Sequence, residues 1–240
     1  LYGTLCHLKK WKDQSYERRL ILGVCAAQKD KELVRDRAPW VDVVIGTHNT
    51  NDVINLLNQS EDWGPITQII EESKDIESEI LPVRESGFSA FVTIQIGCNN
   101  SCTFCIVPSV RGIEISRRPS DIINEIKNLS NEGIKEITLL GQNVNSYGRD
   151  LMINNKRSPY FTQLLYKIHE IDGIERIRFT SPHPKDFKRE TLVAVSELPK
   201  IANQIHIPVQ SGSDKILSSM HRGYNQKKYL SKIDMIKNII

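Results

Sequence analysis

The sequence has few cysteines, no long apolar run and almost no excess of one charge sign. Its 240 residues contain five cysteines, too few for a disulfide scaffold at this length. The longest apolar runs, such as residues 20–25 and 41–45, fall far short of the roughly 20 residues that a membrane-spanning helix needs, and we find no signal peptide. With 39% apolar and 25% charged residues, the composition excludes a wholly disordered chain. We therefore expect a soluble, cytoplasmic protein of one large or two smaller domains.

Charge varies along the chain although the net charge is only +3. Residues 1–60 carry +2, residues 61–90 carry −6 and residues 91–240 carry +7. An acidic stretch followed by Pro82 and Gly87 is typical of a linker, and the alternative is a solvated helix on one continuous domain. We therefore predict a first domain over residues 1–62, a linker over 63–88 and a second domain over 89–240.

The first domain shows alternating strand and helix patterns. An apolar run over residues 20–24 ends at Cys25 and predicts a buried parallel strand. A polar helix over 30–37, a second buried strand over 41–45 and a helix beginning near Asn51 follow. This order predicts part of a doubly wound α/β domain.

The second domain shows the same alternation four times. Strands are predicted at residues 91–96, 136–140, 176–180 and 204–209. In the clearest helix, Ser120 is the expected N-cap and Gly133 the expected C-terminal residue, with Ile122, Ile126 and Leu129 on the buried face. Helices between successive strands predict a parallel sheet, and polar residues follow all four strands at the edge where such sheets bind ligands.

Three of the five cysteines, Cys98, Cys102 and Cys105, lie within eight residues, directly after the predicted strand 91–96. Thiolates at this spacing can hold three of the four irons of an iron-sulfur cube and leave the fourth iron open. A zinc site needs a fourth ligand, and no Cys or His pair follows at a suitable spacing. A redox dithiol of Cys102 and Cys105 would leave Cys98 without a role. The residues favour a cluster, with zinc and dithiol as alternatives.

Six sequence motifs, one of which contains these cysteines, show a family resemblance. They are GCNNSCTFCIVP at residues 97–108, RG at 111–112, SR at 116–117, LGQNVNSYG at 140–148, SPHP at 181–184 and HIPVQSGSD at 206–214. Together they resemble the radical S-adenosylmethionine methylthiotransferases, in the MiaB-type branch that modifies tRNA. The resemblance spans nearly the whole sequence and implies an α/β chain in which a partial N-terminal domain precedes a truncated radical SAM (β/α) partial barrel.

The resemblance also implies a reaction. A [4Fe-4S] cluster on the three cysteines would bind S-adenosylmethionine at its open iron and cleave it to a 5′-deoxyadenosyl radical. That radical would take hydrogen from C2 of N6-isopentenyladenosine beside the tRNA anticodon, where sulfur is inserted and a second S-adenosylmethionine supplies the methyl group. The cofactors carry the hard chemistry, so we expect no catalytic residue beyond the cluster ligands.

Further residues receive roles from the resemblance and from their strand-end positions. We expect Gln142, Asn143, His206, Gln210 and Ser211 around S-adenosylmethionine. Phe104, between two ligands, either shields the cluster or packs within the loop.

The resemblance implies a role for one of the two remaining cysteines. Residues 23–28 are similar to the third cysteine motif of the family's N-terminal domain, so Cys25 is an expected ligand of a second [4Fe-4S] cluster. Its two partner cysteines would precede Leu1, and the barrel's last strands would follow Ile240. We therefore expect a fragment that can hold the radical cluster but cannot complete methylthiolation. Cys6 is expected to be an ordinary semi-buried residue.

The expected partners are a tRNA anticodon loop and an electron donor such as flavodoxin or ferredoxin. We expect the protein to be a monomer and not to bind membranes. The basic excess of the second domain is weak support for tRNA; it includes Arg111, Arg117, Arg118, Arg149, Lys156 and Arg157. Three alternatives stay open: a zinc-stapled nucleic-acid-binding module, a ferredoxin-like carrier, and a methylthiotransferase for another tRNA base or a ribosomal protein.

Overall fold

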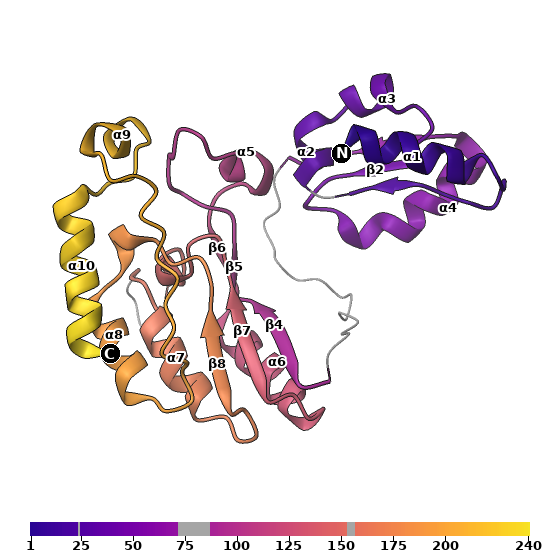
Figure 1. Cartoon of the computed structure of the whole chain (residues 1–240). Helices are drawn as coiled ribbons and strands as arrows, with labels where there is room; N and C mark the ends of the chain where they lie inside the picture. Colours follow the sequence, from indigo (N-terminus) through magenta and orange to yellow (C-terminus); the bar gives the residue numbers. More distant parts are fainter. Residues whose placement is uncertain (24, 72–86, 153–156) are drawn as a thin grey trace. The chain divides into compact units, whose positions relative to one another are not determined.

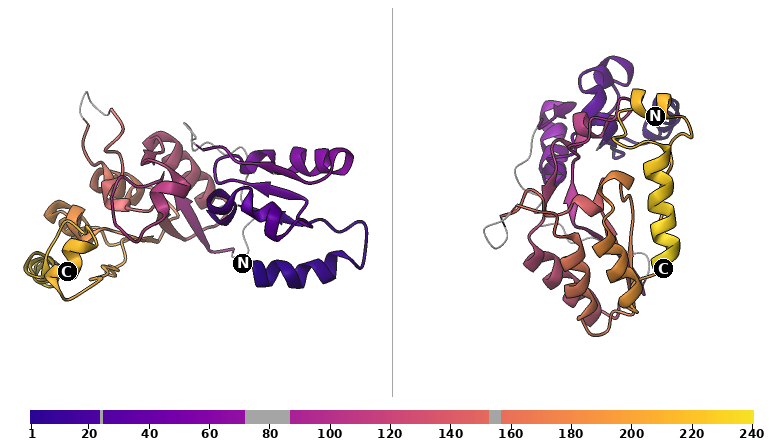
Figure 2. Two further views of the ribbon diagram at one scale, coloured as in Figure 1. Left: turned by 90° about the horizontal axis from the view of Figure 1, so that it is seen from above. Right: turned by 90° about the vertical axis from the view of Figure 1, so that its left-hand side faces the viewer.

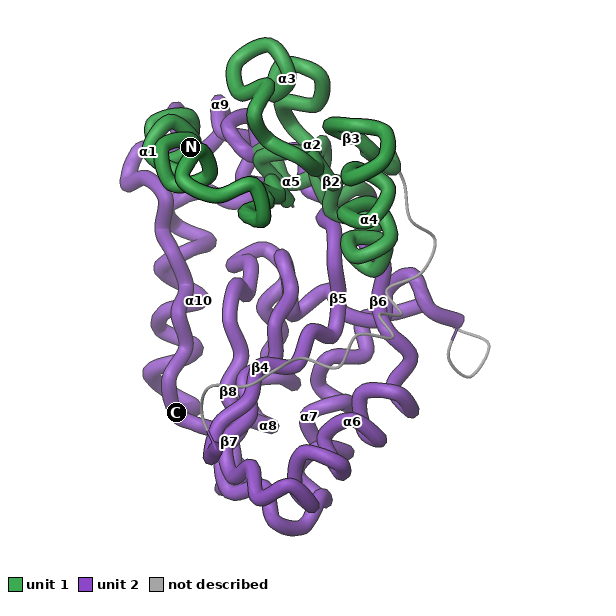
Figure 3. Tube along the Cα trace, turned by 90° about the vertical axis from the view of Figure 1, so that its right-hand side faces the viewer, with its two compact units in different colours: residues 1–81, 106–112 green, residues 82–105, 113–240 purple. Residues whose placement is uncertain are grey.

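Two units make up the chain, one from residues 1–81 and 106–112 and the other from residues 82–105 and 113–240 (Figures 1 and 3). The computed structural model describes residues 1–23, 25–71, 87–152 and 157–240. Most of the predicted linker and Val24 of the predicted first strand therefore lie outside the described residues. Within those ranges, no helix combines the length and the apolar character that a membrane span requires.

The first unit contains a three-stranded parallel sheet in the order β1-β2-β3. Among its described residues the elements are α1 (Tyr2–Lys12), β1 (Ile21–Leu22), α2 (Cys25–Asp30), α3 (Leu33–Arg37), β2 (Val43–Ile45), the 3-10 helix η1 (Thr50–Asp52), α4 (Val53–Trp63), β3 (Ile66–Gln68) and α5 (Val107–Arg111). The last of these helices joins this unit although it follows the cysteines in sequence, and Val110 O accepts a hydrogen bond of 2.6 Å from Thr47 Oγ1.

The central strand β2 is buried on both faces. Val44 packs with Leu5 of α1 and Val34 of α3, whereas Val43 and Ile45 pack with the α4 side. Because successive side chains of a strand point to opposite faces, helices cover both sides of the sheet. The predicted doubly wound α/β arrangement is confirmed.

Three local predictions for this unit were wrong. The helix predicted at 30–37 is two helices, which are separated near Lys31, where φ is +47°. Cys25 begins α2 instead of ending a strand. The predicted linker starts too early, because Ile66–Gln68 form β3 and pair with β2; this strand has only three residues, of which Thr67 and Gln68 are polar, so its sequence pattern is weak.

The second unit is built on the parallel sheet β4-β7-β8, with a separate antiparallel pair β5-β6. Its elements are β4 (Ser89–Thr93), β5 (Gln95–Ile96), β6 (Ile115–Ser116), α6 (Pro119–Asn131), β7 (Glu136–Leu140), η2 (Val144–Ser146), α7 (Phe161–His169), β8 (Arg176–Phe179), η3 (Pro184–Asp186), α8 (Arg189–Glu197), α9 (Asp214–Ser219) and α10 (Gln226–Ile239). Three of the four predicted strands are therefore present.

Helices α6, α7, α8 and α10 follow one another as neighbours beside this sheet; Figure 2 shows α10 next to α8. The predicted buried face of α6 is confirmed, since Ile122, Ile126 and Leu129 join the main core with apolar residues of β4, β7 and β8. The N-cap is Arg118 rather than Ser120, because Pro119 has the fixed φ that suits a first helical position. Gly133 closes the turn after α6 with φ +93°, as predicted.

The predicted fourth strand at 204–209 is wrong. The chain makes one isolated parallel bridge, between Ile177 and Ile201, and then continues without regular pairing. The carbonyl oxygens of this segment accept hydrogen bonds from tyrosine hydroxyls instead of from another strand. Tyr224 donates to Val209 O at 3.1 Å and Tyr229 to Ile207 O at 2.8 Å. Pro208 also has no N–H for a ladder.

Candidate functional site

The three clustered cysteines lie on one loop at the carboxyl end of β5. Gly97 turns the chain out of the strand with φ +72°, a conformation that side chains rarely adopt. Cys98 and Cys102 are partly buried and Cys105 is exposed. A hydrogen bond of 3.1 Å from Cys105 N to Cys102 O closes a turn that brings the two ends of the C-x-x-C segment back toward each other.

The Cys98 sulfur lies in a partly buried position. Burial raises the pKa of the Cys98 thiol, and the N–H of Asn100, 3.5 Å from Sγ, acts in the opposite direction. The amide side chains beside it are held as well. Asn99 Oδ1 accepts from Glu114 N at 3.0 Å, and Asn100 Oδ1 accepts from Lys185 Nζ at 2.8 Å. The loop is therefore anchored from two other segments.

The Cys102 sulfur has a cationic neighbour. Arg222 Nη1 lies 3.2 Å from Sγ, and the guanidinium carbon lies 5.7 Å from the ring centroid of Tyr224. Arg222 is only 8% exposed. The guanidinium can therefore donate a hydrogen bond to the Cys102 sulfur from a buried position. Sequence reasoning missed Arg222, because a separation of 120 residues leaves no local signal.

A buried polar network lies next to this loop. Ser146 Oγ is 2.8 Å from Glu114 Oε2 and 3.2 Å from Gln95 Nε2. Burial raises the pKa of Glu114 above its ordinary value, against the opposing hydrogen bond from Ser146. Among the described residues, Glu114 Oε1 and Gln95 Oε1 have no hydrogen-bond partner. Such unpaired acceptors are costly in a protein interior and are typical of a site that binds a donor.

The loop after β7 holds two of the predicted S-adenosylmethionine contacts. Asn143 is buried and donates from Nδ2 to Asp186 Oδ2 at 2.8 Å, while Arg149 donates to Asp186 Oδ1 at 2.9 Å. Burial acts to raise the pKa of Asp186, but the bonds from Asn143 and Arg149 outweigh it and the pKa lies below its ordinary value. The amide oxygens of Gln142 and Asn143 are buried, and no described atom pairs with them. Both residues therefore follow the carboxyl end of β7, each with a buried amide oxygen that has no partner among the described residues.

The other predicted contacts lie on a different segment. His206 and Gln210 are exposed and Ser211 is half-buried, all on the irregular segment that replaces the fourth strand. Phe104 is 58% exposed, so the structure does not show it packed within the loop.

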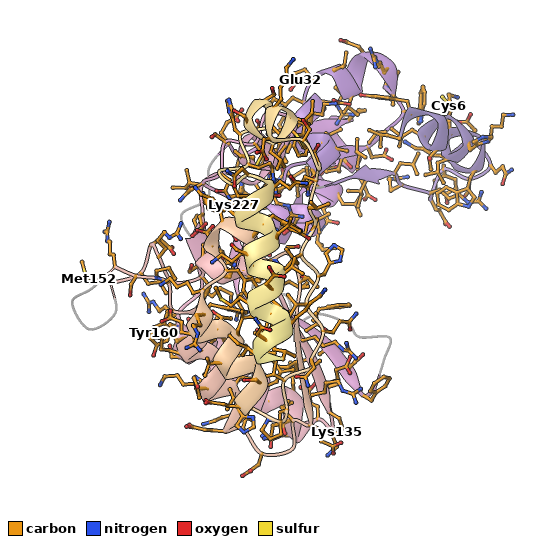
Figure 4. The ribbon with its side chains drawn as sticks, turned by 60° about the vertical axis from the view of Figure 1, so that its left-hand side comes forward. Cys6, Glu32, Lys135, Met152, Tyr160 and Lys227 are labelled. Carbon is orange, nitrogen blue, oxygen red and sulfur yellow. The ribbon has the colours of Figure 1, made fainter. Side chains whose placement is uncertain are left out.

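The remaining cysteines and one basic residue complete the list. Cys25 is partly buried at the start of α2 in the first unit. Cys6 is exposed, contrary to the prediction, because its neighbour Leu5 takes the inward position on α1; Figure 4 labels Cys6 on that helix. Lys156 lies outside the described residues.

The donor set fits a three-ligand iron-sulfur cluster. Three thiols share one loop, a buried cation contacts one of them, and backbone and amide groups surround another. Within the described ranges, however, no three His, Cys, Asp or Glu side chains already converge as a metal-binding group. The sulfurs would therefore have to close around a cluster rather than receive it in a finished cage.

Comparison with known proteins gives a consistent picture. A family model described as "Radical SAM superfamily" matches residues 92–240. The chain is 46% identical over 241 residues to a tRNA-2-methylthio-N(6)-dimethylallyladenosine synthase of Corynebacterium glutamicum (strain R), covering 99% of this chain and 46% of that protein. It is 47% identical to the enzyme of that name from Streptomyces viridosporus, covering 100% and 47%. The chain thus spans just under half the length of these curated relatives.

A solved structure shares the fold at low identity. The cobalamin-dependent S-adenosylmethionine radical enzyme OxsB, with aqua-cobalamin and S-adenosylmethionine bound, aligns with a TM-score of 0.56 and 14% identity, over 90% of this chain and 34% of that one. At this identity, the likeness concerns the fold alone.

Proposed function

The chain belongs to the Radical SAM superfamily, and from this premise we propose that it carries the radical core of a tRNA methylthiotransferase. The reaction is methylthiolation of C2 of N6-isopentenyladenosine next to the anticodon. The observation that carries the proposal is the loop of three thiols at the ligand-binding edge of the second unit. Identity of 46% to a tRNA-2-methylthio-N(6)-dimethylallyladenosine synthase supports the choice of substrate.

The cofactors are a [4Fe-4S] cluster and S-adenosylmethionine, which supply the radical chemistry when bound. Cys98, Cys102 and Cys105 hold the cluster and leave one iron for S-adenosylmethionine. The unpaired amide oxygens of Gln142 and Asn143 accept hydrogen bonds from the bound S-adenosylmethionine.

Four more residues lie around these cofactors in the proposal. His206, Gln210 and Ser211 contact S-adenosylmethionine once it is bound. Phe104 covers the cluster, which is consistent with its exposed ring. The work of the protein is to bind, orient and exclude water.

Residues outside the core complete the proposal. Residues 1–62 belong to a domain that carries a second [4Fe-4S] cluster, with Cys25 as one ligand. Exposed basic side chains such as Arg118 and Arg149 attract the tRNA phosphates. A base in a single-stranded anticodon loop can be splayed into a pocket. A reduced flavodoxin or ferredoxin supplies the electron, and the protein works as a monomer in the cytoplasm.

The cofactor assignment is tested by anaerobic reconstitution with iron and sulfide. We expect about four irons and four sulfides per radical site, and an electron paramagnetic resonance spectrum that changes when S-adenosylmethionine is added. Cys98→Ala, Cys102→Ala and Cys105→Ala should each lose this cluster, whereas Cys6→Ala, at an exposed position, should keep it. Binding of zinc alone, or a spectrum indifferent to S-adenosylmethionine, would overturn the assignment.

The substrate assignment is tested in cells. Transfer RNA from a deletion strain should lack the methylthio group on isopentenylated adenosine, as judged by mass spectrometry of its nucleosides. Unchanged nucleosides would mean that the substrate is another tRNA base or a ribosomal protein.

A further inference from the structure

The segment Ser219, Met220, His221 and Arg222 begins at the last residue of α9 and contacts the cysteine loop, which lies about 120 residues earlier in the sequence. Thr103 donates from its N–H to Met220 O at 3.3 Å and from Oγ1 to Ser219 O at 3.1 Å. His221 Nδ1 lies 3.2 Å from Ser101 O. With the Arg222 contact to Cys102, four successive residues of this 219–222 segment touch three successive residues of the loop.

The backbone of the 219–222 segment is bent to make these contacts. His221 has φ +54°, in the left-handed region, and Gly223 follows with φ +71°. A non-glycine residue there costs about 1 kcal/mol or more, so surrounding contacts must hold it. The hydrogen bond between His221 Nδ1 and Ser101 O is one such contact.

Arg222 is the unusual member of the segment. It is 8% exposed, and the described hydrogen-bond partners of its side chain are the Cys102 sulfur and, at 3.5 Å, the Tyr224 hydroxyl. No carboxylate among the described residues forms an ion pair with it. A buried cation is costly unless an anion or several acceptors compensate it. The group at hand that can carry negative charge is the sulfur of Cys102 once it serves as a ligand.

We propose that the 219–222 segment is a built-in clamp for the cluster loop, in which Arg222 is a positioning residue that orients Cys102 and balances the negative charge of the ligated cluster. The charge-balancing half rests on the proposed function, because it requires a cluster. The loop-ordering half concerns the metal-free chain. Thr103, His221 and the Met220 carbonyl hold the loop backbone, while Arg222 acts on the sulfur.

Four variants of the 240-residue chain separate these roles. Arg222→Met removes the charge and keeps an apolar side chain, and Arg222→Lys restores the charge without the planar fork. Thr103→Val, at an exposed position, removes one bond to the segment and leaves Arg222 in place. Arg176→Met is the matched control, since that arginine is on β8, largely exposed and paired with Glu136. Circular dichroism melts establish that each variant is folded.

In the metal-free chain, hydrogen–deuterium exchange of the peptide covering residues 99–105 reads out loop order. We expect about tenfold faster exchange in Thr103→Val and in Arg222→Met, because the Thr103 N–H depends on the clamp. Exchange equal to that of the wild type in both variants would overturn the loop-ordering role. Should Arg222→Met fail to fold, Thr103→Val decides this point.

In the reconstituted chain, two readouts besides activity test the charge. We expect Arg222→Met to lose iron to a chelator roughly 10- to 100-fold faster than the wild type, as for other groups that support metal ligands. Its midpoint potential should shift to more negative values, because loss of a nearby cation disfavours the reduced cluster. Arg222→Lys should recover much of the potential, and Arg176→Met should match the wild type.

Unchanged iron loss and potential in Arg222→Met would overturn the charge-balancing role while leaving the proposed function intact. A wild-type chain that forms no cluster would overturn the proposed function and this role together, and the exchange experiment would still decide the loop-ordering role.

Discussion

The side chain of Asn145 forms two hydrogen bonds with the main chain of His183. Nδ2 donates to His183 O at 3.0 Å, and Oδ1 accepts from His183 N at 2.9 Å. Both residues are buried, so this pair ties the loop after β7 to the loop after β8. We expect Asn145→Ala to lower the free energy of unfolding by about 2 to 4 kcal/mol, because it leaves a buried N–H and a buried C=O unpaired. Urea denaturation measures this change.

Asn128→Ala is the control for Asn145→Ala, because Asn128 is exposed on α6. It should change stability by no more than about 0.5 kcal/mol. Equal effects of the two substitutions would mean that the bond pair does not hold the loops together.

His183 should make stability depend on pH. Burial, followed by the charge of Arg222, lowers its pKa to about 4. Between that value and the ordinary pKa near 6.5, the unfolded chain binds the proton and the folded chain does not, so stability falls as the pH drops through this window. The expected loss is on the order of 2 to 3 kcal/mol. Urea midpoints at several pH values report it.

His183→Asn, which can still accept a bond from Lys185 N, should flatten this part of the pH profile. His7→Asn, at an exposed position on α1, should leave the profile as it is. A slope that survives in His183→Asn would assign the pH dependence to other groups.

Glu114 should make stability depend on pH in the opposite direction to His183. Burial raises the pKa of its carboxyl group, so in the range just above the ordinary value the folded chain holds a proton that the unfolded chain has released. Stability from this group is therefore present at acid pH and is lost as the pH rises. Glu114→Gln should stabilise the chain more at pH 8 than at pH 5 in thermal melts.

Glu175→Gln, at a largely exposed carboxylate, is the matched control and should show no such difference. If Glu114→Gln destabilised the chain equally at both pH values, the hydrogen bond to Ser146 rather than the buried charge would dominate.

Gly148 has a steric role. Its φ is +82°, and an added Cβ would lie 2.6 Å from the Cβ of Tyr160, which Figure 4 labels. We expect Gly148→Ala to cost about 2 to 4 kcal/mol, from both the backbone conformation and the clash. Gly133→Ala, where φ is +93° but nothing lies within 4 Å, should cost only about 1 kcal/mol in the same urea titration. Similar costs at both positions would exclude the clash as a cause.

Much of the second unit follows from local sequence. The strand at 136–140 and the buried face of α6 were predicted correctly, because apolar periodicity and terminal glycine report local backbone needs. The prediction for the segment 204–209 was wrong, because its apolar pattern fits a strand as well as it fits the irregular segment that the structure shows. Only the packed structure brings the hydroxyls of Tyr224 and Tyr229 to its carbonyl groups.

The sequence by itself determined which residues can ligate a cluster, since the three cysteines and their spacing lie within one loop. Only the tertiary structure decided what surrounds them. Arg222 reaches Cys102, and Glu114 meets Ser146 and Gln95, across long separations in the chain. Such contacts depend on how strands and loops are stacked, and no short stretch of sequence encodes that stacking. The spacing of the thiols is set by the local sequence, whereas the charged groups and hydrogen bonds around them are brought there by the fold.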